Sequence, residues 1–89
     1  MPIEWTASAA KHGIRREDVL YAIAHAEGSQ EVEGRTGETT TVYVGHPHSQ
    51  TDRYIEVIVA ARPPTTLVIF HAMPLTDLHR HLIEEENQS

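Results

Sequence analysis

Hydrophobic and polar residues in the second half of the chain follow the pattern of short β-strands. Residues 39–44, TTTVYV, are rich in β-branched side chains and end at a glycine, which is typical of a strand. Residues 54–61 and 66–71 are apolar on both faces, as interior strands are. The Pro63-Pro64 pair between them cannot donate to a β-ladder and predicts a turn. A short polar edge strand is expected at about residues 30–33.

Helical spacing dominates the first half of the chain. Residues 15–27 form the clearest helix, because Val19, Ile23 and Ala26 fall on one stripe, and we expect Gly28 to end it. Residues 3–5 are a short strand or a lead-in to the first helix.

Two further helices are expected. Thr6 can cap a brief helix that runs through Lys11, and Gly13 offers a left-handed stop. Near the other end Pro74 can begin a helix, and leucines at the spacing i, i+3 and i+7 form its packing stripe. The stripe residues are Leu75, Leu78 and Leu82.

These elements predict one α+β domain over residues 1–89. Its N-terminal helices precede a meander of three or four antiparallel strands, since short connections favour antiparallel pairing, and a helix closes the chain. Helices covering one face of such a sheet leave apolar surface on the other. That surface predicts a protein partner or self-association.

Composition narrows the classes of function. Without cysteine the chain has neither disulfides nor a thiolate metal site, which fits the cytoplasm. Neither a signal peptide nor a stretch of ~18 apolar residues is evident, so we expect no membrane segment. A net charge of −6 opposes nucleic-acid binding by bulk charge. Protonation of all seven histidines would change the charge to +1 (−6 + 7), which indicates a pH-sensitive surface.

Two segments together resemble the BrnT-type toxins. KHGIRREDVLYAI is similar to the front of that family, where a short helix ends in a His-Gly step before an acidic helix start. YVGHPHSQTDRYIEVIVAARPPTTLVIFHAMPLTDLHRHL is similar to the family's sheet and closing helix. The resemblance covers roughly residues 3–83 and depends mainly on the order and spacing of short motifs.

The resemblance implies a RelE-like α+β ribonuclease without a cofactor, which cleaves RNA by general acid/base chemistry and is neutralised by a cognate antitoxin protein. Arg62 matches the family's Arg after the central strand, Ala72 the Ala of its polar turn, and Arg80 a basic position on its last helix. The chain departs from the family where Met73 and Pro74 lie in place of an Arg-Lys pair, and where His79 replaces a helix Glu.

Cleavage of RNA through its 2′-hydroxyl requires a base, an acid and a cation that stabilises the phosphorane charge. His71 is the candidate base and His79 the candidate acid, with Arg62 and Arg80 as phosphate clamps. We expect these four side chains to converge beside one concave patch at one end of the sheet. Alternatively, His71 fixes the corner after its strand, His79 packs as a half-buried imidazole, and the arginines are solvated.

A second group of cations could contact RNA or the partner. It consists of Lys11, Arg15, Arg16 and Arg53. Since acidic residues follow directly in the sequence, the first three could equally be a balanced, solvated helix start.

The remaining chemistry is sparse. His46-Pro47-His48 could bind a metal only if Asp52 or His71 joined it, and an exposed turn is the simpler interpretation. With one Trp and one Phe, no aromatic platform for stacking bases is predicted.

Three hypotheses remain open: a ribonuclease toxin, a non-catalytic protein-binding module on the same fold, and a histidine-based metal-binding or pH-responsive protein. The missing Arg-Lys pair and the net charge of −6 favour the second.

Overall fold

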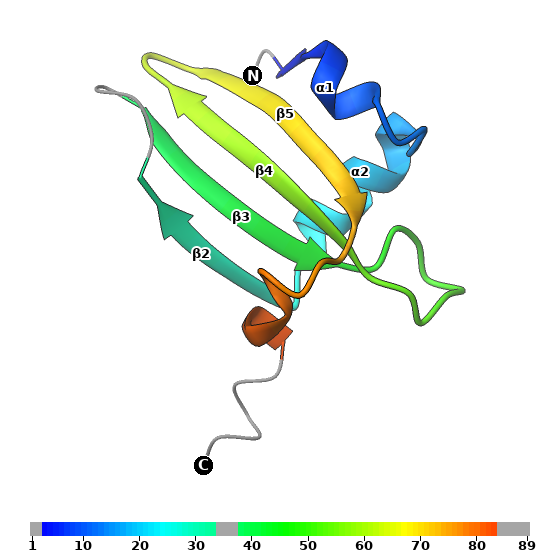
Figure 1. Ribbon diagram of the computed structural model, residues 1–89. Helices are drawn as coiled ribbons and strands as arrows, with labels where there is room; N and C mark the ends of the chain where they lie inside the picture. The colour runs from blue at the N-terminus through cyan, green and yellow to red at the C-terminus, as the bar shows by residue number, and fades with distance from the viewer. Residues whose placement is uncertain (1–2, 34–37, 84–89) are drawn as a thin grey trace.

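A five-stranded mixed sheet organises the fold (Figure 1). The computed structural model describes residues 3–33 and 38–83. Their elements in chain order are β1 (Ile3–Trp5), α1 (Ala7–Ala10), α2 (Arg16–Ala24), β2 (Gly28–Val32), β3 (Thr39–Gly45), β4 (Ile55–Arg62), β5 (Thr66–Pro74) and the 3-10 helix η1 (Arg80–Ile83). The α+β class predicted from the sequence is confirmed.

The strands lie in the order β1-β5-β4-β3-β2. Strands β2 to β5 form an antiparallel meander, as expected. The fifth strand, β1, was foreseen only as one alternative, and it pairs in parallel with β5 through a register that joins Ile3 to Leu67. Three residues with a partner so far away in the chain carry too little local pattern to predict that pairing.

The two helices begin where the sequence predicts them. Thr6 caps α1 by accepting a hydrogen bond from the Ala9 backbone at 3.2 Å, and Gly13 adopts a φ of 71° between the helices. Helix α2 ends at Ala24, earlier than expected, and Gly28 begins β2 instead of stopping the helix. The cause is the sheet, because the Glu27 N–H already donates to the Val44 carbonyl at 2.9 Å.

Both helices lie on one face of the sheet (Figure 1), and the main core fills the space between. The buried sheet residues there alternate along β4, as the pleat requires, whereas those of β5, Ile69 and Ala72, are three positions apart. The buried members are Ala9, Val19, Ala22, Ile55, Val57, Val59, Ile69 and Ala72.

The described residues cover the opposite face at one end only. Leu82 of η1 forms a second cluster with Val42 and Val44 of β3, and Leu75 and Ile83 pack against it. A side chain at Gly28 would place its Cβ 2.1 Å from the Leu82 carbonyl oxygen, so β2 and η1 touch through backbone.

The closing helix differs most from expectation. Pro74 ends β5 and does not begin a helix, and between it and residue 83 the one helical element is the 3-10 turn of η1. The Leu75 N–H donates to the Tyr54 carbonyl at 3.1 Å, so the sheet takes the hydrogen bonds that a helix would need. Leu78 is consequently 73% exposed and does not join the predicted leucine stripe.

Strand β5 contains a β-bulge. Ile58 faces His71 while its neighbour Val59 faces Ile69, which leaves Phe70 as the extra residue. Since Ile69 and Ala72 both pack in the helix-side core, Phe70 and His71 share the other face. Among the described residues, no helix is long and apolar enough to cross a membrane.

Candidate active site

A buried carboxylate lies at the centre of the site. Glu56, in β4, is 2% exposed on the face away from the helices. A glutamate is almost never buried to this extent unless its charge is paired. Its surroundings therefore decide whether it is ionised and what it can do.

Thr76 supplies two hydrogen bonds to this carboxylate. Its hydroxyl donates to Glu56 Oε1 at 2.6 Å, and its backbone N–H donates to the same oxygen at 2.8 Å. Because Thr76 lies two residues after the end of β5, these bonds turn the chain back over the sheet and position His79.

Two imidazoles meet at the other carboxylate oxygen. His71 Nε2 lies 2.8 Å from Glu56 Oε2, and His79 Nδ1 lies 3.2 Å from it. The His79 contact has the distance of an ion pair but not the direction of a hydrogen bond. The His79 side chain is 12% exposed and that of His71 is 29% exposed, so the pair reaches solvent mainly through His71.

These contacts control the protonation of Glu56. Burial by itself raises the pKa of the carboxyl, but the hydrogen bonds from Thr76 and the contacts with the two imidazoles together outweigh burial and lower the pKa. Glu56 is therefore an anion at neutral pH, and it can accept a hydrogen bond from His71 Nε2. The nitrogens left for chemistry are Nδ1 of His71 and Nε2 of His79.

The structure brings together only two of the four candidate catalytic residues. His71 and His79 share the Glu56 carboxylate, whereas Arg62 lies six residues further along β4, roughly 20 Å at the rise of a strand. Arg80 follows His79 in the chain and pairs with exposed Asp77 at 3.1 Å. The expectation that all four converge on one patch is therefore wrong for Arg62, because β4 runs straight from one site to the other.

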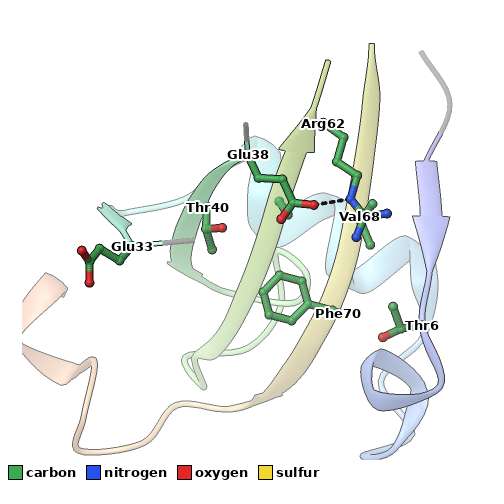
Figure 2. A pocket seen from close by; sticks show the side chains of 8 residues that line it. Thr6, Glu33, Glu38, Thr40, Arg62, Val68 and Phe70 are labelled. Carbon is green, nitrogen blue, oxygen red and sulfur yellow. Dashed lines mark hydrogen bonds and ion pairs between the residues drawn. The ribbon is translucent and has the colours of Figure 1, made fainter. Parts of the chain in front are cut away.

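Arg62 belongs instead to a pocket on the same face of the sheet, beyond the part that η1 covers. Its guanidinium pairs with the Glu38 carboxylate, which reaches across β4 on the side of the Phe70 ring (Figure 2). The pocket has a volume of about 300 Å³. Its lining residues are Thr6, Glu33, Glu38, Thr40, Ala60, Arg62, Val68 and Phe70.

The candidate RNA- or partner-binding cations do not form one patch. Arg16 lies over the Trp5 ring at 5.1 Å, Arg15 pairs with its neighbour Glu17, and Lys11 ends α1. Arg15 and Arg53 do line a shared pocket of about 290 Å³. That pocket lies on the helix side, where Ile55 packs in the main core.

The histidines of the 46–48 loop already have protein partners. His46 Nδ1 donates to the Arg53 carbonyl at 2.6 Å, and His46 Nε2 lies 3.2 Å from Glu27. His48 Nδ1 accepts from the Gln50 N–H at 3.2 Å. Over residues 3–33 and 38–83, no three potential metal ligands are grouped so that they could hold an ion.

Sequence reasoning did not identify Glu56 or Thr76. Glu56 was grouped with the apolar residues of its strand, although a carboxylate between apolar neighbours is itself a signal, since such a charge needs partners. Thr76 carries no comparable signal, because its role depends on where the chain turns after β5.

Comparison with known proteins adds no family. No model of a known protein family matches the chain, and a search of curated proteins finds no significant match.

Proposed function

We propose that this protein is a ribonuclease, the toxin of a toxin–antitoxin pair, and that Glu56, His71 and His79 are its acid/base centre. The observation that carries the proposal is the meeting of two imidazoles at one oxygen of a buried, ionised carboxylate. The resemblance of the chain to BrnT-type toxins supports the choice of RNA as substrate and of an antitoxin as partner. Such a toxin would act on RNA in the cytoplasm.

In the proposed reaction, His71 Nδ1 removes the proton from a ribose 2′-hydroxyl. The resulting oxygen attacks the adjacent phosphorus, the bond from phosphorus to the 5′-oxygen breaks, and protonated His79 Nε2 gives its proton to that leaving oxygen. The products are a 2′,3′-cyclic phosphate and a free 5′-hydroxyl. Glu56 orients both rings and stabilises the imidazolium of His71 as it forms.

Arg80 is the proposed phosphate clamp. It adjoins His79 in the chain, and its partner Asp77 is 97% exposed. An exposed ion pair contributes only about 0–1 kcal/mol, so the guanidinium can exchange Asp77 for a phosphate at little cost. Arg62 has no part in this step, because it lies at the far end of β4.

The test is cleavage of end-labelled RNA by the purified protein. We expect His71→Ala and His79→Ala each to reduce kcat/KM by about 10²–10⁴, the usual contribution of a general acid or base. His48→Ala, in an exposed loop, is the matched control and should cleave like wild type. Expression without the antitoxin is expected to arrest growth, and both active-site variants should relieve the arrest.

A second candidate is a non-catalytic module that binds a protein. It is favoured by the ion pair of Arg62 with Glu38, since the family's matching arginine is then committed to a carboxylate away from the imidazoles. The same experiment separates the two functions. If the wild-type protein leaves RNA intact yet binds the product of an adjacent gene tightly, the protein-binding module is the correct function and the nuclease is not.

A further inference from the structure

A preformed pocket with a mostly apolar floor lies on the half of this sheet face that residues 3–33 and 38–83 leave open. Thr40, Ala60 and Val68 are 5%, 2% and 4% exposed, so β3, β4 and β5 each contribute one packed side chain to it. The half-buried Phe70 ring stands beside them, with the Glu38 carboxylate on the same side of the sheet (Figure 2). An aromatic ring beside a carboxylate suits a planar ligand that donates hydrogen bonds.

The β-bulge joins this pocket to the acid/base centre. Consecutive residues of a regular strand point to opposite faces, but the bulge places Phe70 and His71 on the same face. A ligand stacked on Phe70 therefore lies one residue from the imidazole that contacts Glu56. Successive parts of one bound nucleotide could occupy the two places.

The carboxylate of Glu38 retains capacity to accept hydrogen bonds. A carboxylate offers about four acceptor positions, and the Arg62 Nε–H uses one, on Oε2. The ion pair holds the group in place and compensates its charge, which reduces the repulsion of an RNA phosphate. Glu38 is thus a positioned acceptor at the edge of the pocket.

We propose that this pocket binds a guanine base of RNA, stacked on Phe70 with its Watson–Crick edge toward Glu38, so that the 3′-phosphate of the same nucleotide reaches His71. The inference rests on the proposed function and gives it a base preference, namely cleavage on the 3′ side of guanosine. Proteins commonly read unpaired RNA bases by this combination of stacking and edge recognition.

The preference for guanine follows from the donors on each base. Guanine presents two adjacent donors, N1–H and the N2 amino group, which together fit the two oxygens of a carboxylate. Adenine and cytosine place a ring acceptor beside their amino group, and uracil flanks its single N–H with two carbonyls. In each of these three cases an acceptor atom of the base would face the carboxylate, and the two would repel each other.

The test is calorimetric titration of the purified protein with 3′-GMP and with 3′-AMP. We expect 3′-GMP to bind about tenfold or more tightly than 3′-AMP, the discrimination that one bidentate contact supplies. Phe70→Leu, which keeps an apolar side chain but removes the stack, is expected to weaken 3′-GMP binding by about tenfold. Glu38→Gln is expected to abolish the preference while leaving 3′-AMP binding unchanged.

Glu31→Gln is the matched control, since this exposed glutamate of β2 lies away from the pocket lining and we expect it to bind both nucleotides as wild type does. The melting temperature of each variant checks its folding, and the wild-type ratio of the two affinities tests the proposal without any variant. Equal affinities for 3′-GMP and 3′-AMP would overturn it, as would an unchanged preference in folded Glu38→Gln.

The outcomes separate this inference from the proposed function. Selective binding of 3′-GMP by a protein that leaves RNA intact would support the guanine pocket and contradict the proposed nuclease activity. Cleavage of RNA equally after all four nucleotides would support the nuclease activity and contradict the guanine pocket.

Discussion

At the scale of single residues, Glu56 connects stability to chemistry. Its carboxylate is buried in an apolar strand, and its partners come from the end of β5 and from the segment after it. The same contacts that compensate a buried charge therefore hold the imidazoles in place. A change at Glu56 is expected to affect both properties together.

We predict that Glu56→Gln destabilises the protein by about 1–3 kcal/mol at pH 7, because the amide group faces protons on His71 or Thr76 where an acceptor is needed. Urea unfolding at equilibrium measures the loss. Glu31→Gln, exposed on β2, should stay within about 0.5 kcal/mol of wild type. An equal free energy of unfolding for wild type and Glu56→Gln would contradict this role.

The pH dependence of this difference has a defined sign. The folded pKa of Glu56 lies below its ordinary value of about 4.3, so its contribution to stability is present in full above that value. The contribution is lost as the pH falls through the folded pKa. The difference between wild type and Glu56→Gln, measured by urea unfolding from pH 7 to pH 3, is therefore expected to shrink below about pH 4.

Part of the candidate site could be predicted from the sequence. His71 and His79 were predicted as base and acid at one end of the sheet, and the structure brings them together. Arg62 was grouped with them because it matches the Arg after the central strand of the BrnT-type toxins. The extended geometry of β4 separates Arg62 from the two histidines. The residue types alone do not show which strand ends lie close together.

At the scale of elements, the segment after β5 shows where local patterns are insufficient. Pro74 and the leucines after it predict a helix, but the Leu75 N–H donates to the Tyr54 carbonyl and the Thr76 N–H donates to the Glu56 side chain instead. Strands with strong β-branched patterns were located to within a few residues. The three-residue strand β1 and the segment after β5, which carry no such pattern, were not.

The backbone contact of β2 with η1 leads to a prediction at Gly28. We expect Gly28→Ala to destabilise the protein by about 1–3 kcal/mol, because its Cβ would meet the Leu82 carbonyl and force β2 and η1 apart. Urea unfolding measures the effect, and Ser29→Ala on the same edge strand is the control. If the two variants were equally stable, the close approach would not matter.

At the scale of the whole molecule, charge limits how RNA can bind. The net charge of −6 opposes a polyanion, and seven histidines can change it toward +1 as the pH falls (−6 + 7). Several of these rings contact carboxylates, among them Glu27 and Glu56. We therefore expect the protein to bind RNA more tightly under mildly acidic conditions, where the net charge is less negative, than at higher pH.

We predict that affinity for a single-stranded 2′-deoxy oligonucleotide, which cannot be cleaved through its 2′-position, rises about tenfold or more between pH 8 and pH 6. Fluorescence polarisation at 0.1 M salt measures it. Repeating the titration at 0.5 M salt should reduce the difference, because salt screens exposed charges. An affinity independent of pH would exclude the histidines as the source of attraction.

The parallel pairing of β1 with β5 has a consequence for the order of events during synthesis. Ile3 pairs with Leu67, which leaves the ribosome more than sixty positions after it. The front strand must therefore wait, unpaired, until nearly the whole described chain has emerged. Long-range pairing of this kind slows folding, so the sheet of the nascent protein would stay incomplete until the residues of β5 have emerged.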